Sequence, residues 1–99
     1  MNVVLRPEAK ADLVDAYDWY DEQQAQLGER FLTFVEDAIS RIQLMPQMYV
    51  RVTEDVRRAK VSRFPYLVYY RVLPDRIELL AVLHSSRSPQ LWRARVELS

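Results

Sequence analysis

The sequence predicts an α+β fold, with an N-terminal strand, an α-helical hairpin packed on a small antiparallel sheet in the order β-α-α-β-β-β, and a short C-terminal helix. Two observations carry this prediction. Apolar residues recur at steps of three and four before residue 46, which is typical of amphipathic helices, and at steps of two after it, which is typical of strands. A chain of 99 residues without cysteine supports one domain, residues 1–99, with a single core and no disulfide framework.

The N-terminal half contains the first strand and both long helices. Residues 2–6 are predicted to form a short strand, and Pro7 suits the first turn of a helix because its missing N–H has no partner there. Helical spacing continues from Pro7 to about Gln24, and a second helical run over 27–45 ends before Pro46. Since only a few residues separate the two runs, the helices fold back as a hairpin and present both apolar stripes to one surface.

The first helix carries an acidic face and an aromatic group. The acidic residues are Asp12, Asp15, Asp18, Asp21 and Glu22. They most simply form a solvated surface, because a metal site would need further ligands from elsewhere in the chain. Tyr17, Trp19 and Tyr20 occur at helical spacing, which favours packing in the core or between the helices.

The C-terminal half contains the remaining strands. Residues 47–55 are predicted to form a loop with some extended character, followed by a strand over 56–61, whose alternation places Arg58 and Lys60 on one face. Residues 66–72 and 76–84 are predicted to form strands because they are rich in β-branched and aromatic residues. Pro74-Asp75 forms a short turn, so the last two strands pair as an antiparallel hairpin.

Both faces of the last strand are apolar. Strict alternation places Ile77, Leu79, Ala81 and Leu83 on one face, and Leu80 and Val82 on the other. The helical hairpin covers one face, so the other needs the C-terminal segment or a partner. Ser88-Pro89 begins a short terminal helix, in which Leu91 and Trp92 close this face as a clasp or stack on a nucleic-acid base.

The composition excludes several kinds of protein. Without cysteine, and with His84 as the sole histidine, the chain has no thiolate or histidine-rich metal site, and we expect no cofactor. It contains no glycine-rich phosphate loop, zinc-protease motif or nucleophile elbow. The N-terminal apolar run is too short for a signal peptide or a membrane span, which predicts a cytoplasmic protein without membrane contact.

The net charge is zero, but the charges are unevenly distributed. Residues 1–50 contain 4 basic and 9 acidic residues, whereas residues 51–99 contain 10 basic and 5 acidic ones. Arginine predominates in the second half, and its planar guanidinium favours a polyanion or an acidic protein segment as partner. The alternative is that the two halves neutralise one another across the fold.

One group of residues has the chemistry of a binding or catalytic site. It consists of Arg57, Arg58, Lys60, Arg71, His84 and Arg87. If these residues converge on one end or face of the sheet, they bind an anionic partner or supply the acid, base and cations of ribonuclease chemistry. His84 has a simpler alternative role as a strand-end residue that orders the following turn. Arg57 and Arg58 also have a simpler alternative role, because charges on an edge strand prevent edge-to-edge aggregation.

In the segments 64–72 and 79–95, Phe64-Pro65-Tyr66 leads into Tyr70-Arg71-Val72, and Val82-Leu83-His84 is followed by Arg87, Pro89 and Trp92. Together with the strand and helical hairpin that open the chain, these segments resemble the RelE/ParE superfamily of type II toxin–antitoxin toxins, and the resemblance covers essentially the whole chain. The resemblance implies a toxin that arrests growth, is linked to plasmid stabilisation, and forms a hetero-oligomer with an antitoxin encoded beside it, whose flexible C-terminal part wraps the toxin. We expect the antitoxin-facing or clasp residues to be Leu80, Val82, Leu91 and Trp92.

The superfamily divides by mechanism. ParE-like members inhibit DNA gyrase without hydrolysing a substrate, whereas RelE-like members cleave mRNA on the ribosome and tend to be strongly basic. The zero net charge, the long helical hairpin and the Val-Leu-His strand end look more like the ParE branch, whose usual companion is a ribbon-helix-helix antitoxin. Two alternatives stay open. One is a ribosome-dependent endoribonuclease that uses His84 as acid or base with Arg58, Arg71 and Arg87 on the phosphates, and the other is a degenerate, non-toxic antitoxin binder.

Overall fold

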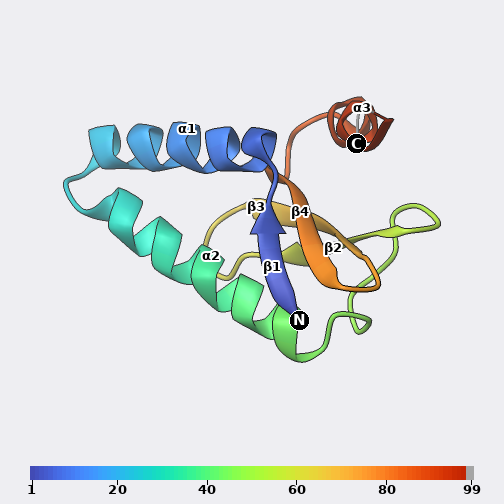
Figure 1. The fold of residues 1–99 in the computed structure, drawn as a ribbon. Helices are drawn as coiled ribbons and strands as arrows, with labels where there is room; N and C mark the ends of the chain where they lie inside the picture. Colours follow the sequence, from blue (N-terminus) through green and yellow to red (C-terminus); the bar gives the residue numbers. More distant parts are fainter. Residues whose placement is uncertain (98–99) are drawn as a thin grey trace.

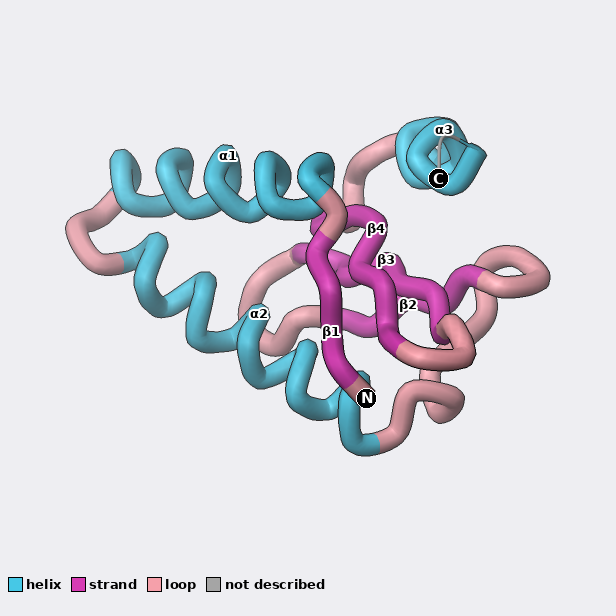
Figure 2. Tube along the Cα trace, in the orientation of Figure 1, coloured by secondary structure: helices cyan, strands magenta, loops and turns pink. Residues whose placement is uncertain are grey.

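A computed structural model describes residues 1–97 of the chain, and all the predicted elements are present in the expected order (Figure 1). The elements are β1 (Asn2–Leu5), α1 (Pro7–Gln23), α2 (Leu27–Leu44), β2 (Val56–Lys60), β3 (Tyr66–Val72), β4 (Arg76–His84) and α3 (Pro89–Glu97). The α+β fold class is therefore confirmed. In Figures 1 and 2, α1 and α2 diverge from their connecting turn, and the sheet lies at their open ends.

The four strands form one sheet in the order β1-β4-β3-β2. Strands β2, β3 and β4 pair antiparallel, as predicted, whereas β1 pairs parallel with β4, so the sheet is mixed and not wholly antiparallel. Because β1 is joined to the rest of the sheet through the two helices, it can lie parallel to its neighbour. Its pairing makes β4 a central strand over residues 76–79 and leaves the β4 edge without a strand partner beyond Leu79.

A β-bulge in β4 overturns the strict alternation expected for this strand. Tyr69 pairs with Ala81 and Tyr70 with Leu79, so Leu80 has no partner on β3. An extra residue moves every later side chain to the opposite face. The helix side of β4 therefore carries Ile77, Leu79 and Val82, and the other side carries Leu80, Ala81 and Leu83. The expectation that Leu80 and Val82 share a face is wrong.

The sheet is covered on both faces. On the helix side, α1 and α2 enclose a core that includes the buried side chains of Phe31, Ile42, Val68 and Tyr70. On the opposite side, α3 covers a smaller cluster, in which the Trp92 ring stacks on Tyr69 with ring centroids 5.5 Å apart. Two separate apolar clusters thus hold the sheet, and the second depends on the C-terminal helix.

Local sequence signals position the C-terminal helix. The Ser88 side chain accepts a hydrogen bond from the Gln90 N–H at 3.3 Å, and Pro89 occupies the first helical position, as predicted. Within residues 1–97, no helix combines the length and apolar character needed to cross a membrane.

Candidate partner-binding groove

The sheet divides the basic residues that were expected to form one site. Arg58 and Lys60 are exposed on β2, where they alternate with the buried Ala59 of the helix-side core. Their side chains therefore extend on the α3 side of the sheet. His84, in contrast, packs edge-on against Tyr66, which contacts the helix-side core. The imidazole and these two cations lie on opposite faces.

Arg57 has a structural role in the loop before β2. Its guanidinium donates hydrogen bonds to the backbone carbonyls of Gln47, at 3.2 Å, and Tyr49, at 2.8 Å. Because the donors of one guanidinium nitrogen are occupied by main-chain oxygens, Arg57 fixes the path of the 45–55 loop against the sheet.

Arg71 lies at the opposite end of β3 from His84. It is opposite Glu78 on β4, and its guanidinium is 3.1 Å from the Asp55 carboxylate and 3.8 Å from that of Glu78. Tyr66, which pairs with His84, is five residues away along β3, or about 16 Å. The structure thus brings neither Arg57 nor Arg71 to the imidazole.

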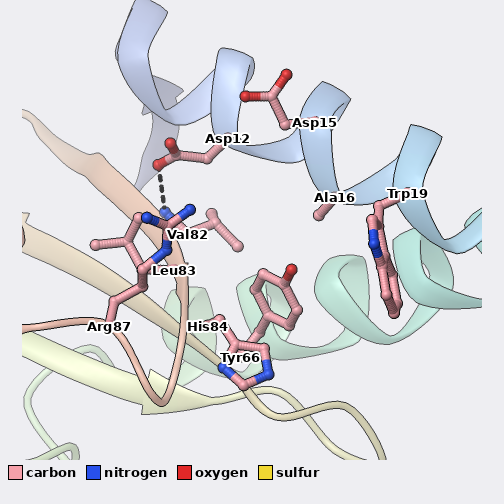
Figure 3. Close-up of a pocket in the computed structure, with 9 residues that line it drawn as sticks. All are labelled: Asp12, Asp15, Ala16, Trp19, Tyr66, Val82, Leu83, His84 and Arg87. Carbon is pink, nitrogen blue, oxygen red and sulfur yellow. Dashed lines mark hydrogen bonds between the residues drawn. The ribbon is translucent and has the colours of Figure 1, made fainter.

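A different set of residues surrounds His84. Two adjoining cavities, of about 260 and 450 Å³, share Trp19, Tyr66, His84 and Arg87 as lining residues. The first cavity extends along α1 to Asp12 and Asp15, and the second extends to Tyr20, Pro65 and Ser86. We call this continuous surface, drawn in part in Figure 3, the α1–β4 groove.

Trp19 and Asp12 were not expected in this position. Trp19 is 55% exposed and forms a wall of the groove, so its assignment to the core is wrong. The sequence did contain a signal: Asp12, Asp15 and Trp19 are spaced i, i+3 and i+7, which places them on one face of a helix. That face meets the end of β4, which the helical pattern alone does not reveal.

The His84 imidazole orders the turn that forms the lower wall of the groove. Its Nδ1 accepts the backbone N–H of Ser86 at 3.0 Å, and the Ser86 hydroxyl lies 2.8 Å from the same nitrogen. Since Nδ1 accepts a backbone hydrogen bond, the neutral ring carries its proton on Nε2. The Arg87 N–H in turn donates to the His84 carbonyl at 3.0 Å. His84 makes the contacts expected of a strand-end residue.

Tyr66 presents a neutral phenol to the groove. Burial raises the pKa of Tyr66, the charge of Arg87 opposes this effect, and the charge of Asp12 adds to it. A phenol with a raised pKa stays protonated at neutral pH and acts as a hydrogen-bond donor, not as a base.

Asp12 joins α1 to the free edge of β4 and to α3. Its Oδ2 accepts the Val82 N–H at 2.9 Å, the bond drawn in Figure 3, and both of its oxygens accept from the Arg95 guanidinium at 2.7 and 2.9 Å. Arg95 also donates to the Leu80 carbonyl at 3.1 Å, and the hydrogen bonds to Asp12 raise the pKa of Arg95. The β4 edge left without a strand partner is therefore capped by side chains.

The four residues expected to be antitoxin-facing or to form the clasp fall into two groups. Leu80, Leu91 and Trp92 belong to the cluster beneath α3, whereas Val82 belongs to the helix-side core because of the bulge. Leu80, Val82 and Trp92 are each no more than 5% exposed. In the described part of the chain, the acidic residues form no group of three or more with metal-binding geometry.

Comparison with known proteins identifies the family. The model of the family described as "ParE toxin of type II toxin-antitoxin system, parDE" matches residues 3–89. The chain belongs to the ParE toxin family. It is 28% identical over 86 residues to Toxin ParE2 of Mycobacterium tuberculosis, an alignment that covers 86% of this chain and 82% of that protein. The predicted resemblance to the RelE/ParE superfamily is thereby confirmed.

Solved structures share the fold. The chromosomal ParDE toxin–antitoxin system from P. aeruginosa contains a chain with a TM-score of 0.64 and 23% identity, covering 85% of this chain and 95% of that one. The isolated E. coli RelE toxin gives a TM-score of 0.56 at 13% identity and covers 99% of this chain and 98% of its own. Because the matching family model is that of a type II toxin–antitoxin toxin, the chain is a toxin of this kind, which implies an antitoxin partner. Nearly all of α3 lies beyond the residues that the ParE family model matches.

Proposed function

We propose that this ParE-family toxin arrests growth by binding DNA gyrase through protein contacts, without hydrolysing a substrate, in the cytoplasm. The observation that carries the proposal is the separation of the basic residues from the only imidazole. Arg58 and Lys60 lie across the sheet from His84, and Arg71 lies at the far end of β3. Among the described residues, only Arg87 of this basic group shares a cavity with His84.

Ribonuclease chemistry makes a geometric demand that this arrangement does not meet. A general base, a general acid and the cations that stabilise the pentacoordinate phosphorane must all lie within hydrogen-bond reach of one phosphodiester. Here the ring nitrogen Nδ1 of His84 is engaged by Ser86, and Tyr66 is a neutral phenol. Inhibition by surface contact needs no such convergence, which favours the gyrase-directed function.

We also propose that a ribbon-helix-helix antitoxin with a flexible C-terminal segment neutralises the toxin in a hetero-oligomer. Membership of the ParE family supports an antitoxin partner. A segment that folds on binding buries a large area with modest affinity for each unit of surface, which suits reversible control of a toxin.

Induced expression of the toxin alone in a bacterial host tests the target. DNA synthesis and protein synthesis are pulse-labelled separately in one culture. We expect DNA synthesis to fall first, together with a DNA-damage response, and purified toxin to inhibit supercoiling by gyrase. The His84→Ala variant is expected to retain this order of events with a weaker effect, because His84 orders the turn that carries Arg87. If translation stops first, mRNA is cut inside reading frames and His84→Ala loses activity, the endoribonuclease alternative is established. If no growth defect is observed, the non-toxic alternative is established.

A further inference from the structure

We infer that the α1–β4 groove is the surface through which the toxin binds its target, and that it accepts a protein segment carrying an apolar, a basic and an acidic side chain. This inference rests on the proposed function, because a toxin that acts by contact needs a recognition surface. It assigns that surface to residues of α1 and of the turn after β4, which lie on the other side of the sheet from the basic side chains of Arg58 and Lys60 on β2.

The first argument is the exposed indole of Trp19. Its ring packs edge-on against Tyr20, with centroids 5.0 Å apart, and Tyr20 is itself held by Phe31 and Phe64 at 5.2 and 5.0 Å. The core-packed Tyr20 ring therefore holds the indole in place, while more than half of the surface of Trp19 is exposed to solvent. A large aromatic ring fixed at the wall of a concave surface is typical of the residues that dominate protein–protein affinity.

The second argument is the pair of opposite charges on the two walls. Asp15 lies on α1, and Arg87 lies on the turn after β4; both are exposed, and neither has an ion-pair partner among residues 1–97. Asp12, the other carboxylate of the groove, is already engaged by Arg95 and the Val82 N–H. The complementary segment therefore places a basic side chain near Asp15 and an acidic one near Arg87, with an apolar side chain against Trp19.

The third argument is that hydrogen bonds within the chain hold the turn that carries Arg87. The Ser85 N–H donates to the Pro65 carbonyl at 2.7 Å, and the Ser86 N–H donates to His84 Nδ1. These bonds tie the turn carrying Arg87 to the residue before β3 and to the end of β4. A surface fixed before binding loses little conformational entropy when a partner docks.

Binding of purified gyrase to variants of the toxin, prepared from its complex with the antitoxin, tests the inference. We expect Trp19→Ala to weaken gyrase binding by about thirtyfold or more, as truncation of a central aromatic anchor does. Arg87→Glu and Asp15→Lys are expected to weaken binding by about tenfold each. Two matched controls, Val14→Ala on the same helix and Arg30→Glu on α2, alter comparably exposed residues outside the groove and are expected to bind as wild type does.

Antitoxin affinity and the thermal unfolding midpoint of each variant are measured in parallel. Unchanged values show that the groove variants are folded, which supports the assignment when gyrase binding falls. Three results would overturn this inference while leaving the proposed function intact. The groove variants could bind gyrase as tightly as wild type does, or Arg30→Glu could lose as much gyrase binding as the groove variants do. The third result is a groove variant that loses antitoxin binding but keeps gyrase binding. Wild-type toxin that fails to bind gyrase at all would overturn the proposed function itself.

Discussion

The carboxylate of Asp12 links three segments that are distant in the sequence. It accepts hydrogen bonds from Val82, 70 positions later, and from Arg95, 83 positions later. Both charged side chains are largely buried, with exposed fractions of 11% and 18%. Replacing one member of such a partly buried ion pair strongly lowers the free energy of unfolding, because the remaining charge is left without a partner.

Asp12→Asn is therefore expected to lower the free energy of unfolding by about 2–4 kcal/mol. An amide keeps one acceptor oxygen but cannot bind both the guanidinium and the Val82 N–H as the carboxylate does. Urea denaturation measures the change. The matched substitution Asp15→Asn, at an exposed carboxylate three residues along the same helix, is expected to stay within about 0.5 kcal/mol of wild type. Equal effects of the two substitutions would contradict this role for Asp12.

The hydroxyl of Tyr70 ties the core to the loop after α2. The side chain is fully buried, and its hydroxyl donates to the Pro46 carbonyl at 2.6 Å. Burial raises the pKa of Tyr70 to about 12, from an ordinary value of 10.0. The unfolded chain thus releases this proton before the folded protein does, so Tyr70 makes stability fall as the pH rises from about 10 to about 12.

Tyr70→Phe separates the contribution of the hydrogen bond to stability from that of the titration of the hydroxyl. At pH 8 we expect a loss of about 1 kcal/mol from the missing hydrogen bond. Between pH 10 and 12, wild-type stability is expected to fall more steeply than that of the variant, by up to about 1.4 kcal/mol per pH unit. Denaturant unfolding at a series of pH values gives both results, and parallel curves above pH 10 would show that the buried hydroxyl does not titrate as argued.

At the scale of the elements, Gly28 sets the distance between the two long helices. A Cβ at this position would lie 2.8 Å from the Tyr17 carbonyl oxygen and 2.9 Å from the Tyr17 ring. The ring can rotate away, but the backbone oxygen of α1 moves only with the helix. Close approach of the backbones, and not a left-handed conformation, therefore requires glycine here.

Gly28→Ala is expected to destabilise the protein by about 1–3 kcal/mol, although alanine is the better helix former by about 1 kcal/mol. The separation of the helices would have to increase to admit the methyl group. Ser40→Ala, at an exposed position of α2, provides the control and is expected to be neutral or slightly stabilising. Thermal unfolding of both variants distinguishes a steric cause from a general effect of alanine in α2.

The elements were predictable because each has a local signal. Pro7 marks the start of α1, Pro46 lies just beyond the end of α2, and Ser88 caps α3. The bulge at Leu80 has no such signal, since it exists only in the register between β3 and β4. One unpaired residue there reverses the faces of all later side chains, which is why the position of Val82 could not be predicted from alternation.

The candidate site was less predictable than the elements, for the same reason. A helical pattern shows that Asp12, Asp15 and Trp19 share a face, but not that this face meets the end of β4. Likewise, a cluster of basic residues in the sequence does not reveal that alternate positions of β2 belong to opposite sides of the sheet. Long-range contacts decide both questions, and these depend on topology.

Across the whole molecule, stability is unevenly distributed. The central strands β3 and β4 are enclosed by two apolar clusters, whereas α3 packs on one side only. Elements with few buried contacts open at a smaller free energy than the centre of a sheet. Amide hydrogen exchange is therefore expected to be faster throughout α3 than in β3 and β4, and Asp12→Asn is expected to accelerate exchange in α3 further. Uniform protection of α3 and the sheet would contradict this description.

The opposite charges of the two halves are only partly paired across the fold. The ion pairs Asp12–Arg95 and Arg6–Glu78 join the halves, whereas Arg41–Asp37 and the pairs of Arg76 lie within one half. Asp12–Arg95 pairs the excess charges of the two halves, whereas Arg6–Glu78 pairs the minority charge of each, so mutual neutralisation accounts for a small part of the charge pattern. Asp15 and Arg87, facing the same groove from different halves, remain available to a partner of mixed charge.

The dependence of α3 on Asp12 also has a consequence for biosynthesis. The ribosome adds residues from the N-terminus onward, so α1 is made long before Arg95 exists to bind its carboxylate. Until residues 89–97 emerge, the Leu80 carbonyl and the apolar surface around Tyr69 face solvent. This side of the sheet is therefore the last part of the fold to be covered, because the helix that covers it is made after every strand.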